Sequence, residues 1–481
     1  MNGARVLLLG VAALLVACGS GATNKAGGSR APTVLTVAAS DSSDQPSTPA
    51  ILHFAAQVAK RSQGSLRIRI VFQAAGHLTP RVEERTIRLV ESGRFDLGFV
   101  GARAWDEFGV TSFRALQAPF LITSTRLLDR VAQSDIAEEM LASLSSRDLV
   151  GLALVPDYLR HPMGLTHKLT SPADFKGARI RIQPSRVTAA IMRALGAVPV
   201  EISNARIGYA IGGRKVDGEE LSLANAVSPA TITGNVAFFG KALTLFANRS
   251  SLDRLSDDQL HSLRAAAAET VRHVAATYPT DAQITKLVCA NRRLIVLASA
   301  ADRAALVRLA QPVYRMLESD SQTRRFIGRI RALKRTTPPD PPLRLTAGCR
   351  RAKPVASATG APRPASLLDG TYRWVITVKD AHAFWGKSFV PTGLPAVNTA
   401  VLQNGTWRMA GPDHDHGTFT IRGDRVRLVW PRIPSVNVFR FRRDADGTIH
   451  WTPVLPMDRG DQFVWGYKPW ERIGPPSRLL R

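Results

Sequence analysis

The stretch from 171 to 220 constrains the fold of this chain more than any other part of it. Its first half reads SPADFKGARIRIQPSRVTAAIMRALGAVPVEI. Residues 178–182 alternate small or apolar side chains with arginine, which is typical of a strand. Ser185 can cap a helix over 187–195, and a second strand over 198–202 follows. This βαβ-type unit predicts an α/β domain.

One arginine makes the stretch unusual. Arg181 places a cation on a strand that is expected to enter the body of a domain. A partly buried guanidinium needs an anion, and its planar fork matches a carboxylate bidentately. Arg181 therefore either binds the carboxylate of a ligand or pairs with a structural Asp or Glu between strands.

Three motifs in this order resemble the solute-binding proteins of tripartite ATP-independent periplasmic (TRAP) transporters, the DctP family. They are KGARIR at 176–181, LGAVPV at 195–200 and KVDGEE at 215–220. The resemblance covers 34–333 and implies a bilobed periplasmic-binding-protein fold with a long helix spanning the hinge. It also implies a small organic acid as ligand and TRAP permease subunits as partners. In the family, the arginine that ends the KGxxxR motif binds the substrate carboxylate, and that position is Arg181.

Further polar residues are expected near this arginine. The family often has a second arginine upstream, at a spacing that Arg160 nearly matches, and Tyr158 lies at the same strand end. Leu221 stands where the family often has an asparagine after the VDG motif, so the chain departs from the family at the usual second clamp on the carboxylate. Glu219 would repel a bound anion unless it faces an arginine or an amino group of the ligand. Otherwise Glu219 and Glu220 form salt bridges with basic residues at a turn.

Two loops at strand ends add candidates. A loop after the first strand of an α/β sheet lies at the carboxyl edge, where ligands bind, and this loop begins at Ser40. Trp105 follows a predicted buried strand over 95–100. Its indole either covers the apolar face of a ligand or seals the domain interface.

The rest of the solute-binding domain, 34–335, is predicted to alternate strands, such as 66–72 and 150–155, with helices. A capping box at Ser256 opens a long helix that runs to about 291, and Pro279 predicts a kink near its middle. Two amphipathic helices follow and run to about 333.

The pattern then changes. Residues 336–366 are rich in Pro, Ala and basic residues and are predicted to be a linker. Over 367–475, six strand candidates are separated by turn dipeptides, the last of them at 463–473. This pattern predicts a small all-β domain, either a lipocalin-like barrel or a sandwich, whose role the sequence does not reveal.

The N-terminus has the features of an exported lipoprotein. Residues 1–17 combine Arg5, an apolar run and small residues, which indicates a signal peptide. Cys18 after Leu-Val-Ala resembles a lipobox cysteine that carries a diacylglyceryl group, and 18–33 form a tether. An ordinary signal peptide with an incidental cysteine is the alternative. The lipid anchor predicts location at the outer face of the cytoplasmic membrane.

The two remaining cysteines are Cys289 and Cys349. Outside the cytoplasm, an even pair indicates a disulfide, with two buried thiols as the alternative. No cysteine spacing in the sequence is typical of a metal site. The sequence Asp-His-Asp-His at 413–416 is interpreted as solvated rather than metal-binding.

The chain has a net charge of +26, from 64 basic and 38 acidic residues. The arginines are dispersed along the sequence, and an exported protein rarely meets DNA, so nucleic acid is not an expected partner. The excess is interpreted as a basic solvated surface, with weak attraction to anionic envelope components.

No nucleophile motif, zinc-protease motif, Walker loop or dinucleotide fingerprint occurs in the sequence. Neither an enzyme nor a bound cofactor is therefore expected. The sequence predicts a solute-binding lipoprotein of a TRAP-type transporter. The alternative is a ligand-sensing or adaptor lipoprotein whose C-terminal β-domain engages a partner.

Overall fold

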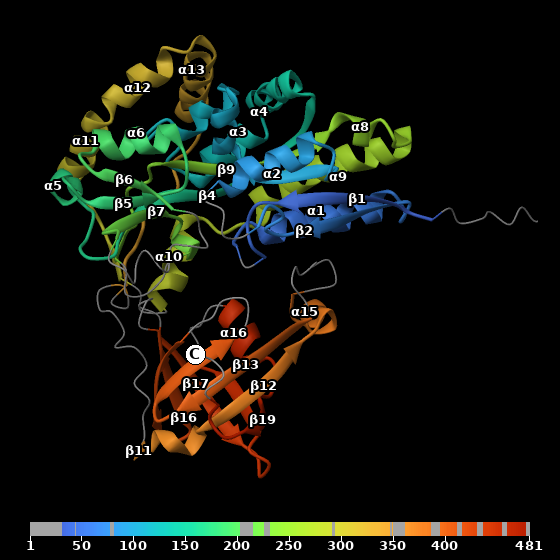
Figure 1. Cartoon of the computed structure of the whole chain (residues 1–481). Helices are drawn as coiled ribbons and strands as arrows, with labels where there is room; N and C mark the ends of the chain where they lie inside the picture. Colours follow the sequence, from blue (N-terminus) through green and yellow to red (C-terminus); the bar gives the residue numbers. More distant parts are fainter. Residues whose placement is uncertain are drawn as a thin grey trace, which may run out of the picture.

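The computed structural model shows two α/β lobes and an all-β C-terminal domain (Figure 1). It describes residues 31–43, 45–76, 81–202, 215–225, 231–290, 294–346, 349, 361–385, 395–410, 416–430, 436–454 and 459–477. The lipobox cysteine Cys18 and residues 413–415 lie outside these ranges. Among the described residues, no helix is both long and apolar enough to cross a bilayer.

The first lobe is built on a parallel three-stranded core. Its strands and the helices that connect them are β1 (Thr33–Ala39), α1 (Thr48–Arg61), β2 (Leu66–Val71), α2 (Val82–Glu91) and β3 (Leu97–Gly101). Strand β1 lies between β2 and β3 and is parallel to both. All five residues of β3 are buried, as expected for a central strand covered on both faces.

Two long strands extend this sheet and join the lobes. Strand β9 (Phe239–Asn248) runs antiparallel to β3 and β4 (Leu149–Gly164). The last four residues of β4, 161–164, leave this pairing and pair with the second lobe. The register of β4 against β9 shifts between Pro156 and Leu159, which is an irregularity of the kind that redirects side chains.

The second lobe contains the βαβ unit predicted from the sequence. Its elements are α5 (Pro172–Phe175), β5 (Arg179–Ile182), α6 (Arg186–Ala194), β6 (Val198–Glu201), β7 (Gly218–Leu221), β8 (Thr231–Thr233) and β10 (Leu294–Val296). Strand β5 lies between β6 and β7 and is parallel to both. Ser185 caps α6 by accepting a hydrogen bond from the Thr188 amide at 3.1 Å.

The predicted long helix is two helices, α9 (Asp257–Thr277) and α10 (Asp281–Ala290). The capping box at Ser256 opens α9 as expected. Tyr278, the residue before Pro279, is extended with ψ of 134°. A proline ring disfavours helical backbone at the preceding residue, so the chain breaks here instead of kinking.

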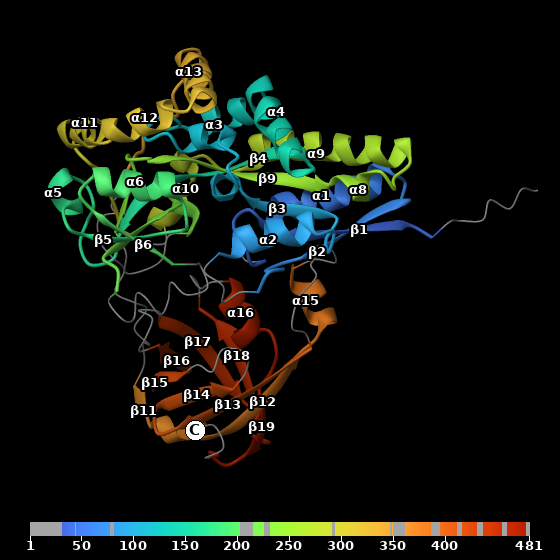
Figure 2. The ribbon, with the colours of Figure 1, turned by 45° about the horizontal axis from the view of Figure 1, so that its top comes forward.

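The remaining helices cover the upper side of both lobes (Figure 2). They are α3 (Thr125–Ala132), α4 (Asp135–Ala142), α8 (Arg249–Leu252), α11 (Ala300–Leu309), α12 (Gln311–Glu318) and α13 (Ser321–Arg335). Short 3-10 turns are η1 (Ala102–Phe108), η2 (Ser112–Gln117), η3 (Ser143–Arg147), η5 (Leu223–Asn225) and η6 (Ala365–Leu368).

The first part of the predicted linker packs on the bilobed part. Asp340 accepts hydrogen bonds of 2.7 Å from both the amide and the hydroxyl of Thr125, at the start of α3. Further on, Cys349 forms a disulfide with Cys289 of α10. We call residues 336–346 together with Cys349 the strap, because they contact the first lobe and are bonded to α10.

The C-terminal domain is an antiparallel, nearly closed barrel. Its elements are β11 (Pro362–Arg363), β12 (Gly370–Ile376), α15 (Val378–Trp385), β13 (Ala396–Gln403), β14 (Thr406–Ala410), β15 (His416–Arg422), β16 (Arg425–Val429), β17 (Val436–Arg443), β18 (Ile449–Pro453), α16 (Arg459–Gly466) and β19 (Glu471–Gly474). The sheet runs from β18 through consecutive strands to β12 and then to β19. A bridge between Ile449 and Trp470 connects its two ends.

Sequence reasoning located most of these strands but was wrong at one place. The segment predicted as a strand over 463–473 is helix α16 followed by the short strand β19. Trp465 of α16 packs against Trp407 and Trp430, with ring centroids 5.0 and 5.4 Å away. Burial of this aromatic face explains a helix where β-prone residues predicted a strand.

Candidate functional site

Charged side chains from both lobes meet at the lobe junction. We call them the junction network: Asp41, Glu83, Arg103, Asp157, Arg160, Arg181, Glu219, Glu220 and Lys241. Most of them are buried, which is unusual for charged residues unless they are paired.

The first lobe contributes Arg103 and Glu83, and a backbone amide holds the Glu83 carboxylate in place. Glu83, in the first turn of α2, accepts hydrogen bonds from the Gly101 amide at 3.0 Å and from Arg103 Nη2 at 2.9 Å. A Cβ on Gly101 would lie 2.5 Å from the Glu83 carboxylate, so this close approach requires glycine. Burial raises the pKa of Glu83, although Arg103 partly opposes this.

A lysine on β9 supplies the second cation of this lobe. Lys241 Nζ lies 2.8 Å from Asp157 Oδ2 and 3.6 Å from Asp41 Oδ2. Asp41 follows β1, and Asp157 lies at the register shift of β4. Burial alone would lower the pKa of Lys241, but Asp157 and Asp41 outweigh it and raise the pKa, so the ammonium stays charged.

Arg181 is the central residue that the second lobe contributes to the junction network. Its side chain is fully buried on β5, and its Nε donates to the Ile202 carbonyl at 2.8 Å. Because Arg181 and Glu219 are register partners on parallel strands, Nη1 comes within 3.6 Å of Glu219 Oε2. Burial lowers the pKa of Arg181 and raises that of Glu219, while each charge favours the other's ionised form.

Arg160 forms the parallel pair on β4. Its Nε donates to Glu220 Oε2 at 2.5 Å, and its Nη2 donates to the Glu220 carbonyl at 2.6 Å. Burial works to lower the pKa of Arg160, but Glu220 outweighs it and raises the pKa, so this guanidinium is also charged.

The network is continuous across the junction. Arg103 of the first lobe donates a hydrogen bond to Gln183, which follows β5 of the second lobe. Next to it, the Ser185 hydroxyl donates to Gln117 Oε1 of η2 at 2.7 Å. A change in the relative position of the lobes would alter these contacts, so the network can respond to lobe motion.

This architecture is that of known solute-binding proteins. The family described as "Bacterial extracellular solute-binding protein, family 7", DctP, matches residues 37–320. The chain belongs to this family.

Curated relatives show the same family at modest identity. A C4-dicarboxylate-binding periplasmic protein DctP from Rhodobacter capsulatus is 30% identical over 169 residues, which are 34% of this chain and 50% of that protein. A solute-binding protein from Verminephrobacter eiseniae is 26% identical over 214 residues, 43% of this chain and 62% of its own length. The matched segments therefore span half to under two thirds of these two relatives.

Solved structures share the bilobed fold. A TRAP periplasmic solute-binding protein from Shewanella oneidensis with bound succinate has a TM-score of 0.56 at 20% identity, covering 63% of this chain and 99% of that one. A protein of the same kind from Xanthobacter autotrophicus with bound β-D-galacturonate has a TM-score of 0.55 at 20% identity, covering 62% and 99%. The C-terminal barrel lies beyond the family match.

Three of the predicted site residues lie together in the network of this family member. They are Arg181, Arg160 and Glu219. Ser40 is buried at the end of β1, beside Asp41, and its hydroxyl contacts the Phe99 carbonyl at 3.5 Å.

Trp105 lies in a buried aromatic cluster of the first lobe. Its indole is fully buried, donates to the Thr244 hydroxyl at 2.8 Å and packs edge-on against Phe246. Trp105 therefore belongs to the apolar core of the first lobe, because neighbouring aromatic rings surround the side chain that the sequence placed in a loop.

Tyr158 is also structural in this state. Its ring stacks on Tyr278 with centroids 5.3 Å apart, at the break between α9 and α10. Burial and Asp157 raise the pKa of both phenols, so both remain neutral. The stack joins β4 to the helix break rather than to Arg181.

Sequence reasoning missed Arg103, Lys241, Glu83 and the pairing of Asp157. A detectable signal existed for two of them. Lys241 interrupts the otherwise apolar run VAFFGKALTLF, and Arg103 directly follows a fully buried strand. A lone cation at such positions indicates a buried partner. The partner carboxylates themselves come from other elements, which spacing in the sequence does not reveal.

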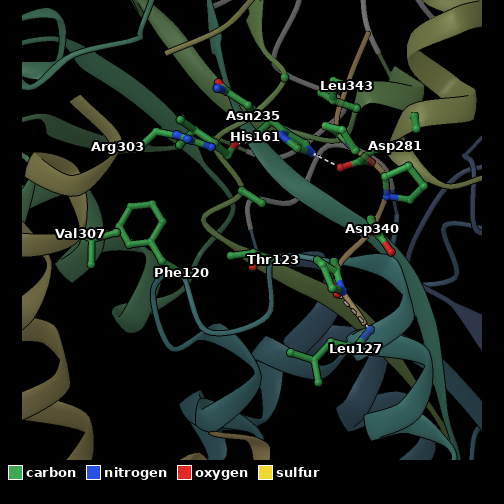
Figure 3. A pocket seen from close by; sticks show the side chains of 18 of the residues that line it. Phe120, Thr123, Leu127, His161, Asn235, Asp281, Arg303, Val307, Asp340 and Leu343 are labelled. Atoms are coloured by element: carbon green, nitrogen blue, oxygen red, sulfur yellow. Dashed lines mark hydrogen bonds and ion pairs between the residues drawn. The ribbon is translucent and has the colours of Figure 1, made fainter. Parts of the chain in front are cut away.

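A separate cavity lies on the other side of β4 (Figure 3). It has a volume of about 660 Å³ and is lined by residues including Phe120, Leu127, Val307, Arg303 and Leu343. His161 faces it and bonds Asp281 through Nε2 at 2.9 Å and the Val236 carbonyl through Nδ1 at 2.8 Å. Since neighbours on a strand point to opposite faces, His161 and Arg160 serve different sites. Apolar side chains form much of the cavity wall, and Arg303 and Lys334 also line it.

Among the described residues, no group of acidic, histidine or cysteine side chains has the arrangement of a metal site. The Arg-Gly-Asp sequence at 422–424 lies at the turn between β15 and β16.

Proposed function

We propose that this protein is an extracytoplasmic receptor that captures a small organic acid between its lobes, with Arg181 binding the carboxylate and Arg160 assisting. The observation that carries the proposal is a fully buried guanidinium on the KGxxxR strand at the junction of two lobes. Burying such a cation is costly unless it has an anionic partner, and a ligand carboxylate matches its planar fork.

The fold supports capture by closure. Strand β4 runs from one lobe to the other, and the helix break at Pro279 lies beside its register shift. A few backbone positions of this kind can absorb the rotation of two lobes. Ligand would enter an open form, and its contacts with both lobes would stabilise the closed one.

Glu219 and Glu220 balance the charges of the two arginines in the present arrangement. Each satisfies one of the two arginines, so neither cation is left without an anion when no ligand is bound. Binding would then redistribute ion pairs inside the network. The acids bound by the two similar structures, succinate and galacturonate, are of the chemical class that such arginines recognise.

Delivery to a TRAP permease and anchoring through Cys18 complete the proposal. Family membership supports the first, and the lipobox-like sequence supports the second. Incorporation of labelled palmitate into the wild-type chain, and its loss in Cys18→Ala, would test the anchor.

A second candidate is a ligand-sensing or adaptor lipoprotein, and the C-terminal barrel favours it. The interior of the barrel is filled by tryptophans; Trp374 and Trp470, for example, stack with centroids 3.9 Å apart. A barrel packed in this way is suited to present an outer surface rather than to hold a small ligand inside. In this reading, the barrel engages a partner while the lobes sense the ligand.

A thermal-shift screen of residues 19–481 tests capture first. The panel contains C4-dicarboxylates, 2-oxo acids, sugar acids, sialic acid and amino acids. A ligand that binds only the folded state raises the melting temperature, and we expect a selective rise for one class. Absence of any rise would shift support to the adaptor function.

Arg179 offers a matched control for Arg181. It lies at the exposed start of the same strand, where it pairs with Asp217 at 2.9 Å. Arg181→Ala is expected to abolish the ligand-induced rise, whereas Arg179→Ala retains it. Because Arg181→Ala leaves Glu219 buried without a partner, the double variant Arg181→Met/Glu219→Gln serves as a folded replacement if the single variant is unstable.

A further inference from the structure

The pairing of Arg181 with Glu219 constrains which acids the site can accept. The two side chains lie side by side on neighbouring parallel strands, with 3.6 Å between Nη1 and Oε2. The site thus presents a cation and an anion next to each other. Both side chains are almost completely buried, so the local charges are weakly screened by water.

The other described cations of the junction network are also matched by carboxylates. Arg103 contacts Glu83, Arg160 contacts Glu220, and Lys241 contacts Asp157. Asp41, 3.6 Å from Lys241, adds a further acid. A ligand carboxylate placed on Arg181 therefore arrives close to Glu219, and like charges at short range in a buried site repel strongly.

Two buried side-chain atoms of the same network have no hydrogen-bond partner among the described residues. They are Arg103 Nε, a donor, and Asp157 Oδ1, an acceptor. Both residues are more than nine-tenths buried, with exposures of 8% and 7%. Asp157 raises the pKa of Lys241, and Arg103 lowers it. Buried polar atoms are rarely left unpaired, so the network lacks one acceptor and one donor in this arrangement.

We propose that the ligand is a zwitterion, an organic acid with an ammonium group on the carbon next to its carboxylate, whose carboxylate binds Arg181 and whose ammonium binds Glu219. The proposal rests on the function proposed above and specifies its substrate class. In an α-amino acid the two charged groups are separated by one carbon, which complements a neighbouring cation and anion. Such a ligand joins the existing ion pair without displacing Glu219, whereas a dicarboxylate or sugar acid has to compete with it.

Matched acids test this directly. Titration calorimetry on residues 19–481 would compare alanine with lactate, leucine with 2-hydroxy-4-methylpentanoate, and glutamate with 2-hydroxyglutarate. Within each pair a neutral hydroxyl replaces the ammonium at nearly constant size. We expect the amino member of at least one pair to bind at least about tenfold more tightly, the range expected for a close buried charge pair.

The variant Glu219→Gln tests whether Glu219 causes the preference for the amino acid over the hydroxy acid. It removes the negative charge and keeps the size, so we expect it to weaken amino-acid binding and to strengthen binding of the hydroxy acid, reversing the ratio. Glu139→Gln is the control, because that carboxylate is exposed and pairs with Arg325 and Arg329 away from the network. It should leave the ratio unchanged.

The outcomes separate this inference from the function on which it rests. If hydroxy acids, dicarboxylates or sugar acids bind the wild-type protein as tightly as the amino acids do, the zwitterion proposal is wrong while solute capture stands. An unchanged ratio in a folded Glu219→Gln variant also overturns it. If no acid of any class binds, both proposals fail. Should Glu219→Gln not fold, the wild-type ratios alone decide.

Discussion

At the scale of single residues, the chain satisfies buried charge by pairing it. The sequence placed Arg181 on a predicted strand by its motif and Arg160 at the end of another strand, and the structure brings both into the junction network. The carboxylates that face them are positioned by strand pairing, which is set only once the sheet forms. Trp105 illustrates the opposite case, since a large indole after a strand fits a ligand face and a core equally well, and only its neighbours distinguish the two.

Asp129 is expected to make the stability of the folded chain depend on pH. Burial, with a contribution from Asp340, raises its pKa from 3.8 to about 7. The folded state therefore holds a proton that the unfolded state releases, so stability falls as pH rises from about 4 to about 7. We expect Asp129→Asn to remove this fall and to add about 1 kcal/mol to the free energy of unfolding at about pH 8.

Urea unfolding at several pH values measures this difference. Below about pH 3, where Asp129 is protonated in both states, the variant and the wild-type protein should agree. Glu138→Gln, at an exposed position on α4, is the control. An equal effect of Asp129→Asn at low and high pH would contradict the assignment.

At the scale of elements, proline and packing decide where the sequence prediction holds. The strands and the helix of the 171–220 stretch formed as predicted because local pattern, cap and burial agree. The long helix broke at Pro279, and a predicted barrel strand became α16, because backbone restriction and aromatic packing outweighed the local pattern. The contacts of the strap with α3 also came from tertiary structure, since its composition indicated only a linker.

The disulfide of the strap is expected to contribute substantially to the stability of the folded chain. The bond between Cys289 and Cys349 closes a loop with a sequence separation of 60 and joins α10 to the end of the strap. We expect Cys289→Ser/Cys349→Ser to lower the free energy of unfolding by about 2–4 kcal/mol, because the unfolded chain regains freedom.

Comparison with and without reductant checks this prediction. Reductant should lower the melting temperature of the wild-type protein toward that of the double variant and leave the variant unchanged. A wild-type protein insensitive to reductant under denaturing scans would show that the bond adds no stability.

At the scale of the whole molecule, the two parts have different cores. The sequence contains 8 tryptophans, and all except Trp105 follow residue 366. Tryptophan rings pack together with aliphatic and phenylalanine side chains in the barrel core, whereas in the cores of the lobes Trp105 is accompanied mainly by aliphatic and phenylalanine side chains. The sequence predicted the change from α/β to all-β beyond the linker, because the periodicity of its apolar residues changes there.

Two unfolding transitions should follow from this division. Tryptophan fluorescence is expected to report mainly the barrel, while far-ultraviolet circular dichroism at the helical minimum reports mainly the lobes. A bound solute should raise the transition of the lobes and leave that of the barrel in place. Coincident transitions that shift together with ligand would instead indicate one cooperative unit.

The most direct test of the account is titration calorimetry of the best ligand from the thermal screen into the wild-type protein, Arg181→Ala and Arg179→Ala. Truncating one partner of a buried charge pair costs about 2–5 kcal/mol, so the account predicts that Arg181→Ala weakens binding at least about 30-fold. Arg179→Ala should bind as the wild-type protein does. Wild-type affinity in a folded Arg181→Ala variant would contradict the claim that this buried arginine captures the solute.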